Sequence, residues 1–85
     1  MASAIGERLA RLAGGTQVLV VTHSPQVAAR GAHQWRIAKA SDGAVTRTAV
    51  VPLSANERRE EIARMLSGAD VTDEARAQAA VLLAH

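Results

Sequence analysis

The first apolar positions of the chain recur at helical spacing. Ile5, Leu9 and Leu12 would lie on one face of a helix, and the glycine pair 14–15 provides a stop signal. Gly6 lies inside this segment and costs about 1 kcal/mol of helix stability relative to alanine. The pattern therefore predicts an amphipathic helix that depends on packing against another element.

The pattern changes after the glycine pair. Residues 16–22 form an almost continuous apolar and β-branched run, which predicts a strand covered on both faces, as in a parallel sheet. Such a strand needs neighbouring strands. Ser24 and Pro25 then suit an N-cap and a first helical position, so a short helix is expected from Pro25 to about Ala29, ending at Gly31.

The middle of the chain shows two extended runs. Residues 33–40 and residues 45–51 flank a turn signal at 41–43, and Trp35 and Ile37 would share one face. These features predict a β-hairpin.

Two helices are expected after the hairpin. Ser54 and Glu57 have the spacing of a capping box, and Gly68 would end the helix that begins there. A last helix would begin near Thr72, with two acidic residues in its first turn. The positions expected to face the core are Ile62, Met65, Leu66, Ala75, Ala79, Leu82 and Leu83. The fold class is therefore α/β, in the order helix, strand, short helix, hairpin, helix, helix.

The composition limits the core that these elements can build. Eighty-five residues give room for a single small domain, residues 1–85. Hydrophobic residues make up 48% of the chain, but alanine supplies a large share, Trp35 is the sole aromatic residue, and cysteine is absent. So thin a core suggests that a partner completes the fold.

The charge balance favours no particular partner. Lysine and arginine number 10 against 8 acidic residues, a net charge of +2, although the pI is near 10.5. The basic residues are scattered, so only the pI supports a small nucleic-acid binder. One dense mixed run, residues 57–61, has the spacing typical of a solvated helix face.

His23 is the best candidate for chemistry. It follows the predicted strand, where ligands gather in sheets covered by helices, and its imidazole can donate to a phosphate oxygen. The backbone N–H groups after Ser24 would add positive potential. The alternative is that His23 only satisfies backbone groups, as Thr22 and Ser24 would in such a turn.

Other chemistry has less support. Ser24 lacks the glycine-flanked elbow of a catalytic serine, and His23, His33 and His85 lack metal-ligand spacing. Residues 14–16 are not a GxxxxGK[ST] phosphate loop. Trp35 is expected to pack in the core rather than to stack on a base, since one isolated aromatic makes no stacking platform.

Residues 18–29 (VLVVTHSPQVAA) resemble the switch-histidine loop of ABC-type ATPases, in the form found in SMC-like DNA repair proteins of the RecN type. The resemblance continues through the predicted hairpin and covers nearly the whole chain. Its other supporting segments are residues 4–9, 60–68 and 72–76.

The resemblance implies that the chain is the C-terminal portion of an ATPase head. His23 would be the switch histidine, the catalytic residue that contacts the γ-phosphate of ATP and helps to position the attacking water. The phosphate loop, the signature motif, the catalytic glutamate and the coiled-coil arms would lie upstream of Met1. ATP with Mg²⁺ would bind only the complete head, so the chain alone is expected to lack activity.

The resemblance also implies partners. These would be the remainder of the head, a second head in a head-to-head homodimer, and DNA bound through the full protein during double-strand break repair and recombination. A cytoplasmic, nucleoid-associated location would follow, consistent with the absence of cysteine and of any apolar run near the roughly 20 residues of a membrane span. Residues 1–15 also lack the basic region of a signal peptide.

The main alternative is a small interaction or dimerisation module without nucleotide chemistry. It would use the alanine-rich last helix and an unprotected strand edge to bind a second copy or another protein.

Overall fold

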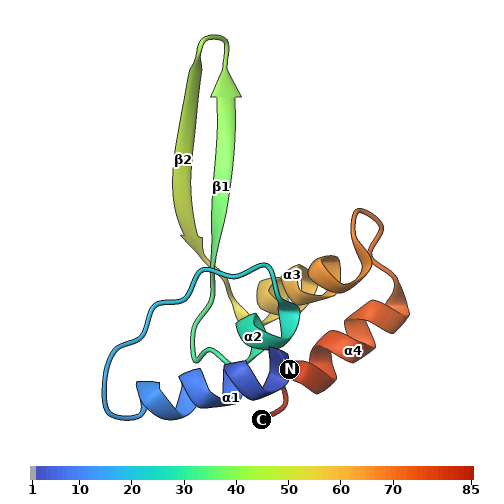
Figure 1. Ribbon diagram of the computed structural model, residues 1–85. Helices are drawn as coiled ribbons and strands as arrows, with labels where there is room; N and C mark the ends of the chain where they lie inside the picture. The colour runs from blue at the N-terminus through green and yellow to red at the C-terminus, as the bar shows by residue number, and fades with distance from the viewer. Residues whose placement is uncertain (1) are drawn as a thin grey trace.

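The computed structural model describes residues 2–85 as four helices and one two-stranded antiparallel sheet (Figure 1); Met1 lies outside the described residues. The elements are α1 (Ala2–Ala13), α2 (Pro25–Ala29), β1 (Trp35–Asp42), β2 (Val45–Pro52), α3 (Ala55–Ser67) and α4 (Asp73–Leu83). The mixed α/β class and the order of these six elements agree with the sequence pattern. None of the helices in the described part of the chain is long and apolar enough to cross a membrane.

The helices form a small cluster with α2 at its centre. This five-residue helix packs against α1, α3 and α4, and α3 also packs against α4. The buried core consists of Ala29, Ile62, Ala63, Ala75 and Ala79. Ile62 is its one large side chain, so the core is as thin as the composition predicts. Partly buried side chains around it include four predicted core positions, Met65, Leu66, Leu82 and Leu83.

The helix ends follow the predicted capping signals. The Ser24 hydroxyl accepts a hydrogen bond from Val27 N–H, and the Thr72 hydroxyl accepts one from Ala75 N–H. The capping box forms at the start of α3: the Ser54 hydroxyl accepts from Glu57 N–H, and the Glu57 carboxylate accepts from Ser54 N–H. Gly68 ends that helix with a φ of 82°, a left-handed value that favours glycine. The predicted helix boundaries are therefore confirmed.

The hairpin forms, but its turn lies further along the chain than predicted. Asp42 pairs with Val45, so the loop consists of two residues, of which Gly43 has a φ of 64°. Glycine takes this conformation without steric cost, which allows Ser41 to stay in the ladder opposite Thr46. The predicted turn at 41–43 therefore contains Gly43 correctly, but it begins two residues too early, because Ser41 and Asp42 belong to β1.

The hairpin projects away from the helices as a narrow arm (Figure 1). Neither strand packs against a helix of the described chain. Trp35 is 54% exposed, and its neighbours on the same face, Ile37 and Val50, are exposed as well. The prediction that Trp35 packs in the core is wrong, because no element of residues 2–85 covers this face.

The strand predicted at residues 16–22 does not form either. Residues 14–24 make an irregular connection that swings outward between α1 and α2 (Figure 1). Leu19 and Val21 are 76% and 83% exposed. A strand requires a neighbour with which to exchange backbone hydrogen bonds, and none of the described residues provides one.

Candidate functional site

The candidate site is the His23 loop, residues 22–24, between the apolar run and α2. Two side chains order the backbone here: Ser24 N–H donates to Thr22 Oγ1 at 3.0 Å, and Val27 N–H donates to Ser24 Oγ at 3.4 Å. The Ser24 hydroxyl also donates to Gln26 Oε1 at 3.2 Å. Thr22 and Ser24 thus bond within the turn, as expected for these residue types.

His23 lies between these two turn residues with its side chain exposed to solvent. Within residues 2–85 its imidazole makes no hydrogen bond, which leaves both ring nitrogens accessible to a ligand. The ring can act as donor and as acceptor. Its contact with ATP remains a prediction.

The three histidines are not brought together. His33 is exposed just before the hairpin, whereas His85 places Nε2 at 2.5 Å from the carbonyl oxygen of Ala29. Among the residues that the structure describes, no three side chains of the metal-binding types are grouped to hold an ion.

Sequence reasoning missed Arg58. The charge pattern of the run 57–61 predicts a solvated face for all its members, and Arg59 and Glu60 are indeed exposed. The Arg58 guanidinium is instead half-buried and reaches the carboxyl end of α2, and this partial burial lowers its pKa. Helical spacing could have revealed this, since Arg58 lies one turn before the buried Ile62 on the same helix face.

Arg58 joins three segments of the chain. Its Nη2 donates to the carbonyl oxygens of Ala28 at 3.0 Å and Ala29 at 3.2 Å, and also to that of Gly31. Its Nε donates to Gln34 Oε1 at 3.1 Å, directly before β1. One side chain of α3 therefore connects the end of α2, the following turn and the start of the hairpin.

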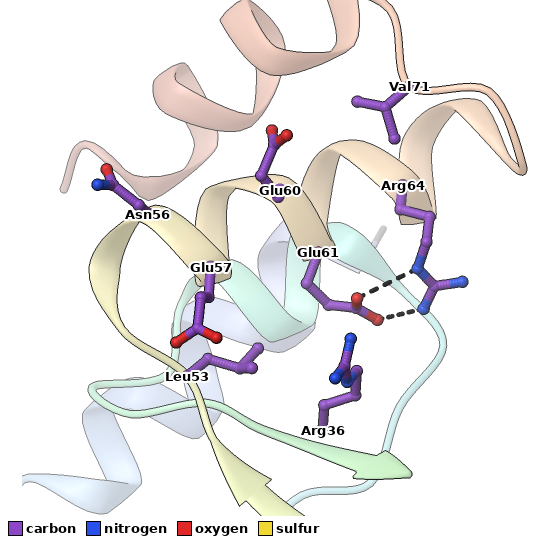
Figure 2. A pocket seen from close by; sticks show the side chains of 8 residues that line it. All are labelled: Arg36, Leu53, Asn56, Glu57, Glu60, Glu61, Arg64 and Val71. Carbon is purple, nitrogen blue, oxygen red and sulfur yellow. Dashed lines mark hydrogen bonds and ion pairs between the residues drawn. The ribbon is translucent and has the colours of Figure 1, made fainter. Parts of the chain in front are cut away.

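A shallow hollow of about 360 Å³ lies between the base of the hairpin and α3 (Figure 2). Figure 2 shows Arg36 pointing toward Glu61, which is itself paired with Arg64. Hydrogen bonding to Glu61 raises the pKa of Arg64. The full lining is Arg36, Leu53, Asn56, Glu57, Glu60, Glu61, Arg64 and Val71. Mixed and partly paired charges of this kind offer no single ligand chemistry.

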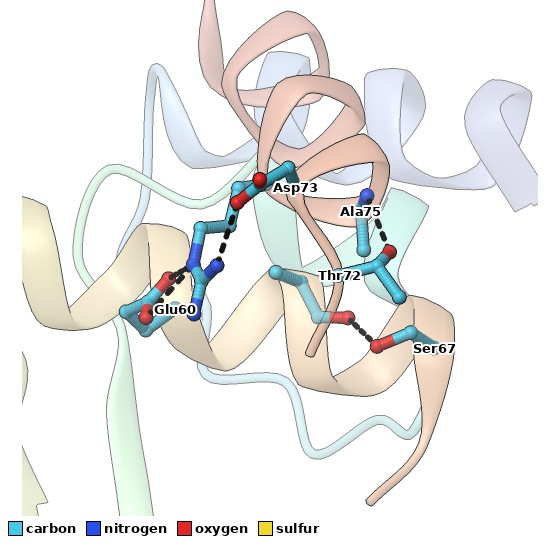
Figure 3. A network of polar contacts seen from close by, with 7 residues as sticks. Glu60, Ser67, Thr72, Asp73 and Ala75 are labelled. Atoms are coloured by element: carbon cyan, nitrogen blue, oxygen red, sulfur yellow. Dashed lines mark hydrogen bonds and ion pairs between the residues drawn. The ribbon is translucent and has the colours of Figure 1, made fainter. Parts of the chain in front are cut away.

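A second polar network connects α3 to α4 (Figure 3). Arg76 donates to Glu60 Oε2 at 2.9 Å and to Asp73 Oδ1 at 3.0 Å, and the bond to Glu60 is the main cause of its raised pKa. These side chains are exposed, so their ion pairs contribute little to stability.

The sequence that contains the His23 loop is similar to known DNA repair proteins. Over 79 residues, 93% of the chain, the sequence is 52% identical to the DNA repair protein RecN of Streptomyces coelicolor. It is 45% identical to the RecN of Xylella fastidiosa strain 9a5c over 83 residues and 51% identical to that of Deinococcus radiodurans over 67. The chain is a RecN-type sequence. No family-wide sequence profile matches it.

The match covers a segment of RecN rather than its whole length. The chain spans 14% of the Streptomyces protein, 15% of the Xylella protein and 12% of the Deinococcus protein. Nearly all of this chain, including the His23 loop and α3, falls within the 98% that aligns with the Xylella RecN. The resemblance in the sequence to RecN-type proteins is therefore confirmed.

Proposed function

We propose that this chain forms the C-terminal part of an ATPase head in a RecN-like DNA repair protein, and that it supplies His23 to the ATP site. The observation that carries the proposal is the exposed His23 imidazole at the end of an uncovered apolar run. The similarity to RecN proteins supplies the context in which that run would be covered.

Exposed apolar side chains support a larger folded unit. Leu19 and Val21 lie on the connection before His23, and Trp35 and Ile37 lie on the hairpin, all more than half exposed. Burying a side chain of this size contributes about 1.5–3 kcal/mol. Strands from the remainder of a head would pair with residues 16–22 and convert that run into the strand that its sequence predicts.

His23 would then lie at the carboxyl end of a buried strand. A neutral imidazole N–H there can donate to an oxygen of the γ-phosphate, or orient the attacking water toward it. The catalytic carboxylate, the phosphate loop and the ligands of Mg²⁺ would come from parts of the head outside this chain. His23 therefore has a positioning and charge-stabilising role, and the chain alone is expected not to hydrolyse ATP.

The wider role follows the relatives that are named DNA repair proteins. A head of this type would dimerise with a second head and contact DNA through the complete protein, in double-strand break repair and recombination. The cytoplasm, near the nucleoid, is the corresponding location.

A chimera tests the role of His23. In the Streptomyces coelicolor RecN, this chain replaces the segment that it matches, and ATP hydrolysis is measured with and without His23→Ala. We expect turnover to fall about 100-fold, with ATP binding and the melting temperature retained, because one transition-state contact is lost. The matched control is His33→Ala, which changes another exposed histidine. Full turnover in the His23→Ala chimera would show that the proposed role is wrong.

One observation favours the interaction module as a second candidate. The apolar groups on the connection and the hairpin would also suit a contact between copies of this chain. The alanine-rich last helix supports it only in part, since Ala75 and Ala79 are buried inside the chain whereas Ala77, Ala80 and Val81 are exposed. Sedimentation of the pure chain distinguishes the two candidates, because a folded monomer at all concentrations would eliminate the dimerisation module.

A further inference from the structure

We propose that Arg58 is a positioning residue for His23: by fixing the carboxyl end of α2 to the first turn of α3, it determines where α2 holds the His23 loop. This inference rests on the proposed function of His23. It is carried by the contacts of Arg58 with Ala28, Ala29, Gly31 and Gln34.

Arg58 and His23 are connected through the short helix α2, whose backbone is restrained at both ends. α2 has five residues, so Ala28 and Ala29, whose carbonyls accept from Arg58, lie one helical turn from the N-cap Ser24. Ser24 is the residue directly after His23, and Pro25 restricts the backbone at the first helical position. A shift of the carboxyl end of α2 therefore moves His23 with it.

No other polar side chain of the described residues ties this end of α2 to α3. The other contacts there include the apolar packing of Ala28 and Ala29, the close approach of Gly6 of α1 to Arg30, and the His85 contact to the Ala29 carbonyl. Apolar packing of alanine side chains allows sliding, whereas a guanidinium has fixed donor directions. A cation is also favoured beside the carbonyls at the end of a helix. Arg58 thus supplies the directional restraint.

The position of the His23 loop affects the rate of ATP hydrolysis because reacting groups must be held in the correct geometry. A misplacement of about 1 Å can reduce a rate about 100-fold even when the altered residue never touches the substrate. Loss of Arg58 should therefore lower turnover more than it lowers ATP affinity.

The test uses the RecN chimera described above, with Arg58→Met. Methionine keeps much of the side-chain length but removes all five donors. We expect kcat for ATP hydrolysis to fall about tenfold, while KM changes by less than about twofold. Arg59→Met is the matched control, since Arg59 is the adjacent exposed arginine, and it should leave both constants unchanged.

Two readouts separate positioning from simple loss of stability. Hydrogen exchange of the peptide spanning residues 22–31 should become about tenfold faster in the Arg58→Met chimera and stay unchanged in the control. In the double variant with His23→Ala, the Arg58 substitution should cause no further loss of kcat, because its effect passes through His23.

Each alternative result has a distinct meaning. Additive losses in the double variant, or unchanged exchange in residues 22–31, would overturn the positioning role while leaving the role of His23 intact. Full turnover in the His23→Ala chimera would instead overturn the proposed function itself. If Arg58→Met does not fold, Arg58→Lys keeps the charge with fewer donors, and Gln34→Ala removes one acceptor. The inference then requires both variants to lower kcat, and wild-type kcat in either of them would refute it.

Discussion

Gly6 of α1 lies directly against Arg30 at the end of α2. A Cβ at position 6 would be 2.9 Å from Arg30 Cγ and 3.2 Å from the carbonyl oxygen of Gln26. The Nε of Arg30 is buried and has no hydrogen-bond partner among residues 2–85. The absence of a side chain at Gly6 is therefore what allows α1 to approach α2 so closely.

Gly6→Ala is expected to destabilise the chain by about 1 kcal/mol. Alanine raises helix propensity by about 1 kcal/mol, but overpacking costs about 1–3 kcal/mol when a backbone oxygen is among the atoms that must move. Urea unfolding followed by circular dichroism measures the difference. Gly15→Ala is the control, since a Cβ there meets nothing within 4 Å. A Gly6→Ala chain more stable than the wild type would contradict the close packing.

Ile62→Ala is expected to remove most of the folding free energy of the helices. Ile62 is the only large side chain that is fully buried in the described chain, and truncation of such a residue costs about 2–5 kcal/mol. Val81→Ala should change stability little, because Val81 is 67% exposed. Equal melting temperatures for the two variants would show that the core is misplaced.

Acid should weaken the start of α3. The hydrogen bond from the Ser54 backbone N–H lowers the pKa of Glu57, with smaller contributions from the Ser54 hydroxyl and Arg36. A carboxylate whose pKa is lower in the folded state stabilises the fold above its unfolded pKa, and this contribution is lost as the pH falls through the folded value. Glu57→Gln should therefore lose less stability between neutral pH and acid than the wild type does.

Denaturant titrations at the two pH values measure that difference. Glu74→Gln is a suitable control, because the Glu74 carboxylate makes no hydrogen bond within residues 2–85. The same acid sensitivity in wild type and Glu57→Gln would mean that the capping box does not contribute.

Trp35 provides an optical test of the projecting hairpin. Because the indole is 54% exposed, a small neutral quencher should reduce its fluorescence strongly in the isolated chain. Ile37→Ala, a change on the same strand face, should leave this quenching unchanged. Weak quenching in the wild type would mean that the hairpin folds back onto the helices or meets a second copy.

Structural features that depend on one or two neighbouring residues, such as helix ends, were predicted most reliably from the sequence. Helix ends at Ser24, Ser54 and Gly68 depend on one side chain or one glycine, so a single sequence is sufficient to locate them. The predicted turn begins two residues too early because Asp42 and Gly43 suit several loop types, and only the register of the ladder selects among them.

Structural features that depend on contacts between residues far apart in the sequence were predicted less well. Residues 16–22 have strand composition but lack strand neighbours among the described residues, and Trp35 has core composition but no covering element. Arg58 was missed for the same reason, since its acceptors lie 24 to 30 positions away along the chain. His23 lies directly before the N-cap of α2, which Ser24 and Pro25 mark in the sequence, whereas its contact with ATP stays a prediction.

The separation of the hairpin from the helices implies two levels of cooperativity. Pairing between β1 and β2 is local in sequence, whereas the helical core joins Ala29 to residues more than 30 positions later. An isolated two-stranded hairpin is only marginally stable in water. The ladder amides should accordingly open at a lower free energy than those of α3 and α4, so that the hairpin and the helices behave as two separate foldons.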